Sequence, residues 1–321
     1  MMNATTLGNT NQINIPPAIG CYVPIHVIGE GASSVVVVVR HSKTKDLFAC
    51  KIISRKNQEN YTFIYRLETE IRVLERIRHP GIVKIQDILY IDDLICIIME
   101  YGRRGMLYDY VINRGHLPEW EATKILVSLL NTLEYLHSIN VAHRDLKLDN
   151  IVLTQDFQPK LVDFGLSYQA LSDDDNYRRT FCGTLEYVAP ESFEHKNYDG
   201  RKADIWSLGI CYYSMLTCQY PWKGTDRGIM KAILAGEVEI PEQLSDRTKE
   251  VLKLLLTPDP EKRPTAREML ELMYQMGVPD VKLDTLKTQY NTTVTKHAVI
   301  KQNVFVKGIF ARNKKASSAK Y

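Results

Sequence analysis

The 321-residue sequence has few cysteines and no long apolar run. Its six cysteines are scattered and include no C-x-x-C pair, which argues against a structural zinc site and against a secreted disulfide framework. No apolar stretch approaches the roughly 20 residues that a membrane-spanning helix needs. Residues 1–20 contain neither a basic start nor an apolar core. We therefore expect no signal peptide, a disordered leader over residues 1–20, and a cytoplasmic or nuclear location.

Acidic residues are scarce near the C-terminal end. From Gly277 onward nine Lys and Arg face two Asp and Glu, so residues 277–321 carry +7, the remainder carries −4, and the net charge is +3. The lysines of this tail are spread out and its aromatic residues are few, which specifies no nucleic-acid platform. Residues 304–312 mix apolar and basic side chains, as autoinhibitory and calmodulin-binding segments do. We expect a disordered basic tail, with a calmodulin or intramolecular contact as the alternative.

The rest of the chain divides into a strand-rich part and a helical part. Short β-branched segments bounded by turns predict five strands, at residues 22–28, 35–40, 47–53, 81–88 and 94–99. Apolar residues at helical spacing between Ile64 and Ile77 predict one helix among them. Further apolar stripes predict helices at residues 122–136, 205–216, 229–234 and 251–256. This order of elements predicts an α+β fold.

The end of the domain is also predicted from local signals. Thr265 and Glu268 have the spacing of a capping box, which opens a last helix that continues through Tyr274. Pro279 is expected to stop that helix. The packed domain therefore ends near Met276.

A glycine-rich turn joins the first two predicted strands. In Gly29-Glu30-Gly31-Ala32-Ser33-Ser34 the glycine backbone can approach phosphate groups without an intervening Cβ. A tight hairpin turn is the alternative, because Ser34 stands where the usual phosphate-binding pattern has its third glycine.

Lys51 is the one charged residue of an otherwise apolar predicted strand. A buried ammonium group without a partner is costly, so Lys51 needs an acidic neighbour. Glu70, on the helix predicted between the strands, is the favoured partner, and Glu68 and Glu75 are the alternatives. A lysine that snorkels to solvent at a strand edge is the structural alternative.

Three short strings carry the strongest functional signal. The run His143-Arg144-Asp145-Leu146-Lys147-Leu148-Asp149-Asn150 is followed by Asp163-Phe164-Gly165 and then by Ala189-Pro190-Glu191. With these strings in this order, the sequence resembles the eukaryotic protein kinases over residues 21–276. The resemblance implies a bilobal protein kinase fold. A small β-rich N-lobe with one main helix would span about 21–101, and a larger, mostly helical C-lobe about 106–276.

The resemblance also implies ATP and Mg²⁺ as cofactors and proteins as substrates. Asp145 would orient the substrate hydroxyl, Lys147 would stabilise the transferred phosphoryl group, and Asn150 and Asp163 would bind Mg²⁺. Val35 and Ala49 would cover one face of the adenine, and Leu153 the other. The implied ATP-binding residues are Ile28, Gly29, Gly31, Ser34, Val36, Ala49, Lys51, Glu70, Met99, Glu100, Gly102 and Leu153.

Several structural contacts follow from the same resemblance. Glu191 and Arg263 would form a buried ion pair, and Asp204 would brace the backbone of the catalytic loop. Leu74, Ile85, His143 and Phe164 would form an apolar column between the lobes, although an ordinary core role fits these four positions equally well.

Within the kinases, Lys147 and Gly183-Thr184 are typical of serine/threonine kinases. The segments Gly-Ala-Ser-Ser-Val-Val and Asp-Phe-Gly-Leu-Ser resemble the calmodulin-dependent and AMP-activated kinase-like group. All five positions needed for phosphoryl transfer are intact, which favours an active enzyme over the alternative, an inactive scaffold with the same fold.

Regulation and substrate choice are implied by single residues. Thr180 is a candidate phosphorylation site for an upstream kinase, because a phosphate there can pair with Arg144; an exposed threonine in a flexible loop is the alternative. Asp149 would favour an arginine upstream of the target residue. Beside Thr184, an apolar pocket would favour a hydrophobic residue downstream, and its lining would be Phe181, Leu185 and Val188.

Overall fold

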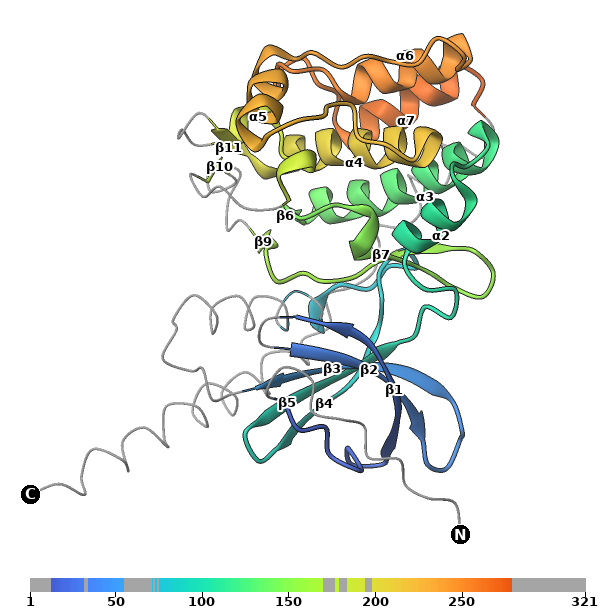
Figure 1. Cartoon of the computed structure of the whole chain (residues 1–321), viewed down its shortest axis with the longest axis vertical. Coiled ribbons are helices and arrows are strands. Elements are labelled where there is room, and N and C mark those ends of the chain that lie inside the picture. Colours follow the sequence, from blue (N-terminus) through green and yellow to red (C-terminus); the bar gives the residue numbers. More distant parts are fainter. Residues whose placement is uncertain are drawn as a thin grey trace, which may run out of the picture. The chain divides into compact units, whose positions relative to one another are not determined.

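The computed structural model describes residues 13–31, 34–54, 71, 73, 75–169, 177–178, 184–193 and 198–278. Within this part of the chain, a β-sheet lies at one end and the α-helices lie at the other (Figure 1). Glu70, Thr180 and Phe181, together with the tail from residue 279 onward, lie outside the described residues. The expectations for these positions are therefore not tested by the structure.

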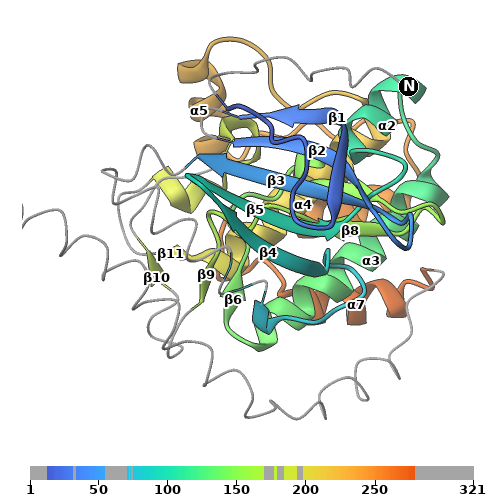
Figure 2. The same cartoon turned by 90° about the horizontal axis from the view of Figure 1, so that it is seen from below.

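One antiparallel sheet of five strands forms the N-terminal part. Its strands follow the order β1-β2-β3-β5-β4, so that β5 lies between β3 and β4 (Figure 2). They are β1 (Tyr22–Glu30), β2 (Ser34–His41), β3 (Leu47–Ser54), β4 (Ile85–Ile91) and β5 (Leu94–Glu100). All five predicted strands are confirmed, but the fourth begins at Ile85 rather than at residue 81.

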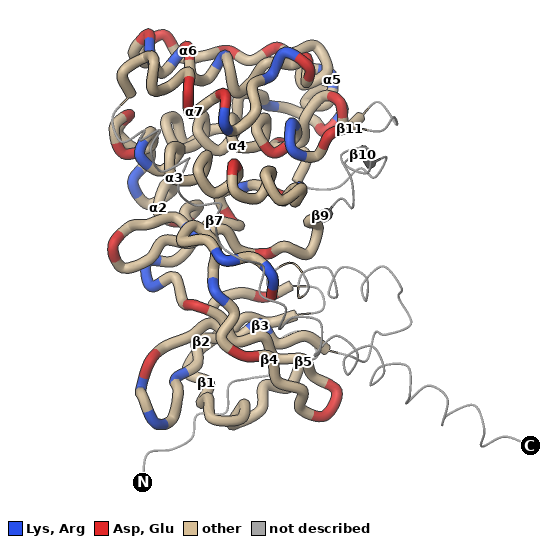
Figure 3. Tube along the Cα trace, turned by 180° about the vertical axis from the view of Figure 1, so that it is seen from behind, with Lys and Arg blue, Asp and Glu red and all other residues tan. Residues whose placement is uncertain are grey.

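Alternation along the strands separates a covered face from a face that carries Lys51. Val35, Val37 and Val39 of β2 belong to a buried cluster with Cys50 and Ile52 of β3 and with residues of β5. The intervening residues point to the other face, where Val36 lies opposite Lys51 in the β2–β3 register. Each strand contains a single Asp, Glu, Lys or Arg, and the strands are mostly tan in Figure 3.

Residues 13–20 complete the covered face of the sheet. Ile13, Ile15 and Ile19 are buried in the same cluster as Val37. Ile19 is hydrogen-bonded to Tyr22 in both directions, at 2.8 and 3.0 Å. The expectation of a disordered leader over residues 1–20 is therefore wrong for residues 13–20, because the sheet offers these isoleucines an apolar surface. We call residues 13–20 the N-terminal brace.

The region between β3 and β4 is only partly described. Ile71, Val73, Glu75 and Arg76 are helical, as the predicted helix requires. Ile71 and Val73 are buried, whereas Glu75 is exposed.

Six α-helices form the C-terminal part among the described residues. They are α2 (Leu107–Arg114), α3 (Glu119–Ser138), α4 (Gly200–Thr217), α5 (Asp226–Ala235), α6 (Asp246–Leu255) and α7 (Ala266–Gln275). The five helices predicted for this part are confirmed. Helix α2 was not predicted, because its buried residues are only Leu107 and Val111. Across the described ranges, no helix is both long and apolar enough to cross a membrane.

The last helix begins as predicted but ends differently. The Thr265 side chain accepts from the Glu268 backbone N–H, and the Glu268 carboxylate accepts from the Thr265 N–H, which confirms the capping box. The helix then ends before Gly277, whose φ of +67° is a left-handed conformation that favours glycine. Pro279 is therefore not needed to stop it.

Short strands and turns connect the helices and hold the loops between them. They are β6 (Val141–Ala142), which pairs with β9 (Tyr168–Gln169); β7 (Ile151–Leu153), which pairs with β8 (Pro159–Leu161); and β10 (Tyr177–Arg178), which pairs with β11 (Tyr198–Asp199). Single 3-10 turns are η2 (Leu148–Asn150), η4 (Leu185–Tyr187) and η5 (Pro190–Phe193).

Candidate active site

A loop between β6 and β7, residues 143–150, carries the predicted catalytic residues. Asp204, on α4, holds the start of this loop by hydrogen bonds. Its carboxylate is almost fully buried and accepts from the backbone N–H groups of His143 and Arg144, both at 2.8 Å. His137 Nε2 lies 3.0 Å from the same carboxylate. The predicted role of Asp204 as a brace of the loop is confirmed.

The imidazole of His143 holds the next turn of the loop. The backbone N–H of Asp145 donates to His143 Nδ1 at 3.3 Å, and His143 Nε2 lies 3.1 Å from the Val162 carbonyl oxygen. Its ring packs on Phe164, with ring centres 4.8 Å apart. Both side chains are fully buried. This contact agrees with the His143–Phe164 part of the predicted column and equally with an ordinary core role, while Leu74 lies outside the described residues.

Around Asp145 the loop brings three predicted residues together. Asn150 Nδ2 donates to the Asp145 carboxylate at 2.9 Å and to its carbonyl oxygen at 2.8 Å. Lys147 Nζ lies 3.2 Å from the same carboxylate and donates to the Thr184 hydroxyl at 3.1 Å. A carboxylate held by an amide donor and beside a lysine can orient a hydroxyl group, and the lysine can stabilise negative charge next to it.

Lys51 and Asp163 meet across the site. Lys51 Nζ lies 3.3 Å from Asp163 Oδ1, which also accepts from the Gly165 N–H at 3.3 Å. Partial burial would raise the pKa of Asp163, but the Lys51 ammonium, the Gly165 N–H and His143 together hold that pKa below its ordinary value. Asp163 is therefore a carboxylate at neutral pH. The predicted partner Glu70 lies outside the described residues.

The donor set suits a hard divalent cation. Both donations from Asn150 come from its nitrogen, which leaves its amide oxygen for another ligand. The Asp163 side chain is about half exposed, at 49%, and it contacts Lys51 Nζ and the Gly165 N–H through its Oδ1. An amide oxygen and a carboxylate oxygen are ligands that Mg²⁺ prefers.

The sheet supplies an apolar wall with the predicted adenine residues. Ala49 and Met99 lie opposite each other in the β3–β5 register and are both buried, as is Leu153 of β7. Val36 shares this face, whereas Val35 is buried in the cluster on the other face. The structure therefore corrects the prediction that Val35 covers the adenine, because a strand turns successive side chains to opposite faces.

The glycine-rich turn is tight at its base. Gly31 N donates to the Ser34 carbonyl oxygen at 2.8 Å, and Gly29 lies opposite Val36 in the β1–β2 register. Ile28 at the end of β1 is 37% exposed. Just after β5, a Cβ at Gly102 would lie 2.6 Å from Val152 Cβ, so only glycine lets the chain pass here.

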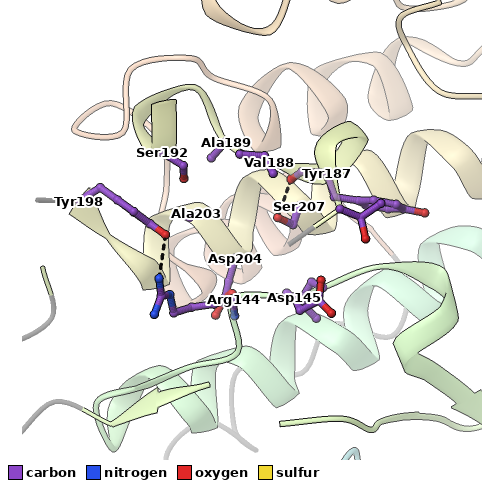
Figure 4. Close-up of a pocket in the computed structure, with 12 residues that line it drawn as sticks. Arg144, Asp145, Tyr187, Val188, Ala189, Ser192, Tyr198, Ala203, Asp204 and Ser207 are labelled. Carbon is purple, nitrogen blue, oxygen red and sulfur yellow. Dashed lines mark hydrogen bonds between the residues drawn. The ribbon is translucent and has the colours of Figure 1, made fainter. Parts of the chain in front are cut away.

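Arg144 lies beside the segment that follows Thr184. Its backbone is left-handed, with φ of +66°, and its Nη2 donates to the Tyr198 hydroxyl at 3.1 Å. Figure 4 shows these two side chains, Asp145 and Asp204 around one pocket. Asp149 and Leu185 are partly exposed, whereas Val188 is buried.

A buried ion pair supports this segment from beneath. Arg263 is fully buried, and its two terminal nitrogens donate to Glu191 at 2.7 and 3.0 Å. Arg263 Nε also donates to the Thr257 carbonyl oxygen at 2.8 Å. The predicted Glu191–Arg263 pair is confirmed.

Three partners of the site residues were not predicted. His137 pairs with Asp204, Tyr198 with Arg144, and Lys160 with Glu100. The pairs are separated by 67, 54 and 60 residues, so no local pattern indicates them. Lys160 does interrupt a short apolar strand, which was the one available signal.

Comparison with known families now identifies the fold. The protein kinase domain family matches residues 22–275, and the chain belongs to this family. The predicted bilobal kinase fold is confirmed by this match and by the observed sheet and helices. Residues 13–20 of the brace lie outside the matched range.

Among curated proteins, the chain is similar to serine/threonine kinases. It is 33% identical over 270 residues to "Serine/threonine-protein kinase SIK2" of Gallus gallus, which covers 83% of this chain and 33% of that protein. It is 37% identical over 258 residues to "Probable serine/threonine-protein kinase MARK-B" of Dictyostelium discoideum, covering 78% of this chain and 35% of that protein.

A third relative has the same relationship. The "Carbon catabolite-derepressing protein kinase" of Candida tropicalis is 35% identical over 271 residues, covering 83% of this chain and 43% of that protein. The matched part of the chain thus corresponds to 33 to 43% of the length of these relatives. The similarities support the predicted resemblance to the AMP-activated kinase-like group.

Proposed function

We propose that the chain is an active serine/threonine protein kinase, which transfers the γ-phosphoryl group of Mg-ATP to a hydroxyl group of a protein substrate. The observation that carries this proposal is the contact of Asn150 and Lys147 with the Asp145 carboxylate. Little covalent chemistry is required of the protein in phosphoryl transfer, so orientation and charge stabilisation are the main tasks.

Each residue has a role in the proposed reaction. Asp145 accepts the hydrogen bond of the substrate hydroxyl and orients its oxygen. Lys147, tied to Thr184, places positive charge beside the reacting oxygen. Lys51 binds the α and β phosphates, and Asn150 and Asp163 hold Mg²⁺, which neutralises phosphate charge when bound. Met99, Glu100 and Gly102 receive the edge of the adenine.

Phosphate transfer from labelled ATP tests the proposal directly. The full chain should phosphorylate a generic basic protein on serine or threonine, and removal of Mg²⁺ by a chelator should stop it. A matched tyrosine peptide should remain unlabelled. A folded protein that binds ATP but transfers no phosphate to any acceptor would contradict an enzymatic function and favour a scaffold.

We also propose that phosphorylation of Thr180 by an upstream kinase raises the activity. The support is Arg144, a cation directly before Asp145 whose side chain already lies at the edge of the segment around Tyr198. A phosphate adds nearly two negative charges that can pair with it. Phosphatase treatment should lower the rate of the unsubstituted protein and leave Thr180→Ala unchanged. Equal rates before and after treatment would contradict this role.

For the substrate we propose the motif Arg-x-x-Ser/Thr-hydrophobic. Asp149 is a carboxylate next to Asn150 and is available to an upstream arginine. In a peptide library, Asp149→Ala should flatten the upstream preference and leave the downstream one. Selection of proline or acidic residues after the target would contradict the proposed groove while leaving the kinase assignment intact.

A further inference from the structure

The β7–β8 hairpin is hydrogen-bonded to the chain segment that enters β4 and to the segment that leaves β5 for the helices. On the side of β4, Leu161 N donates to the Gly81 carbonyl oxygen at 2.8 Å, and Val83 N donates to the Leu161 carbonyl oxygen at 3.1 Å. On the side of β5, Leu153 N donates to the Gly105 carbonyl oxygen at 2.9 Å, and Arg104 N donates back to Leu153 at 3.1 Å. One hairpin thus contacts the entry into β4 and the exit from β5.

A side-chain ion pair adds to these backbone contacts. Lys160 Nζ of β8 lies 2.8 Å from Glu100 Oε2, at the end of β5. The Lys160 side chain is 15% exposed and that of Glu100 is 37% exposed, so the pair is partly shielded from water. The Glu100 N–H also donates to the Lys84 carbonyl oxygen at 3.0 Å. Glu100 is therefore held at its backbone and at its carboxylate.

Two ion pairs found among the described residues join the sheet to the residues after β6, namely Lys160–Glu100 and Lys51–Asp163. Under the proposed function, Lys51 binds the nucleotide and Asp163 binds its metal ion. The side chains of Lys160 and Glu100 have no such task, because Glu100 meets the adenine through its backbone under the proposed function. Their ion pair can therefore persist while nucleotide is bound.

We infer that Lys160 is a positioning residue for recognition of the purine base. By holding the Glu100 carboxylate, it limits rotation of the backbone between Met99 and Gly102. Under the proposed function, the carbonyl oxygens and N–H groups that remain free on that backbone meet the edge of the base, and adenine and guanine differ in donors and acceptors on that edge. Lys160 thus supports the preference for adenine over guanine nucleotides. This inference deepens the proposed function and depends on its adenine site.

The competing explanation is a purely structural salt bridge. Such a bridge would stabilise the fold and leave the ratio of adenine to guanine affinity unchanged. The two explanations therefore differ in a ratio of dissociation constants, which general destabilisation does not move.

The experiment measures binding of Mg-ADP and Mg-GDP to the full chain by calorimetry. We compare the unsubstituted protein with Lys160→Met, Glu100→Gln and the double variant. Lys249→Met is the matched control, because Lys249 forms a surface ion pair with Asp246 on α6. Lys160→Met should weaken Mg-ADP binding three- to tenfold and Mg-GDP binding less than twofold. Lys160→Arg should retain the preference.

Further readouts separate the possible failures. The double variant should bind Mg-ADP no more weakly than either single variant, because each change removes the same interaction. In turnover assays of Lys160→Met, KM for ATP should rise, while kcat should stay within twofold of that of the unsubstituted protein. Equal weakening of both nucleotides, or a lower unfolding temperature with unchanged affinities, would overturn the inference. A chain that binds Mg-ADP but transfers no phosphate would contradict the proposed function, and the binding ratio would still decide the role of Lys160.

Discussion

The two sides of the candidate site are built in different ways. On the sheet side, Lys51 is placed by strand alternation, and its neighbours Cys50 and Ile52 point into the apolar cluster. On the loop side, Asp145 is placed by buried polar contacts that end at Asp204, on a helix about 60 residues away in the sequence. The sheet side therefore depends on apolar burial, and the loop side depends on satisfied hydrogen bonds.

The largest expected effects come from the two residues that the two sides present. Lys51→Met and Asp145→Asn should each lower kcat/KM by roughly a thousandfold or more, because each removes a charge used in phosphoryl transfer. They should differ in binding, since only Lys51→Met removes a phosphate contact. Calorimetry with Mg-ADP should show weaker binding for Lys51→Met alone.

Thermal unfolding is the control for both variants. Each should unfold within a few degrees of the unsubstituted protein, because neither side chain is fully buried. Full activity in either variant would contradict its assigned role.

The next largest effect is expected from Asp204, whose carboxylate accepts the hydrogen bonds that hold the catalytic loop. Asp204→Ala leaves two backbone N–H groups without their acceptor in a buried place, and it should lower the free energy of unfolding by about 3 to 5 kcal/mol. Urea unfolding measures this loss. Asp246→Ala is the control, because that carboxylate is fully exposed on α6. If both variants lost the same small amount, the loop would not depend on Asp204.

The corresponding test on the sheet side concerns the N-terminal brace. Ile15→Ala removes buried apolar contacts and should lower the free energy of unfolding by about 2 kcal/mol, whereas exposed Asn14→Ala should change it little. Affinity for Mg-ADP should be unchanged at temperatures where the variant is folded. Unaltered stability in Ile15→Ala would restore the expectation of a disordered leader.

The smallest effect is a pH dependence at the junction before β4. Burial lowers the pKa of His79 from its ordinary 6.5 to about 4, with Lys160 contributing and Glu134 opposing. His79 Nδ1 also accepts from the Gly81 N–H at 3.1 Å, which requires the neutral ring. The His79 ring therefore takes up a proton more readily in the unfolded chain than in the folded chain. As a result, the free energy of unfolding falls as the pH drops from about 6.5 to about 4.

Urea midpoints at pH 7 and pH 5 measure this dependence. His79→Gln should lose less stability between the two values than the unsubstituted protein does. His26→Gln, on the exposed surface of β1, should behave like the unsubstituted protein. An identical pH dependence in all three would assign the loss to other groups.

Local patterns predicted much of this architecture. The β-branched residues and flanking turns of β2 and β3 identified the strands, and the Thr265–Glu268 spacing identified the cap of α7. The motif residues Asp145 and Asn150 lie together because a single short loop contains them. Such features need only neighbours in the sequence.

Features that depend on distant residues and belong to no recognised motif were missed. The brace resembled a disordered leader because its three isoleucines are separated by an asparagine, two prolines and an alanine, and only the sheet gives them a surface. The Lys160–Glu100 pair joins residues that become neighbours through the β7–β8 hairpin. The prediction that Val35 covers the adenine was wrong for a simpler reason. Successive residues of a strand point to opposite faces, so a shift of one residue selects the wrong face.

The Lys51–Asp163 ion pair has a thermodynamic consequence under the proposed function. Each member is the counter-ion of the other at 3.3 Å, and each is also the binding group for a different ligand, the phosphates for Lys51 and the metal ion for Asp163. A ligand at either group weakens the attraction within the pair, and this cost falls on the first ligand to bind. The second ligand then meets a group whose charge is less neutralised by its partner. Nucleotide and metal ion should therefore bind with positive cooperativity, which is reciprocal by linkage.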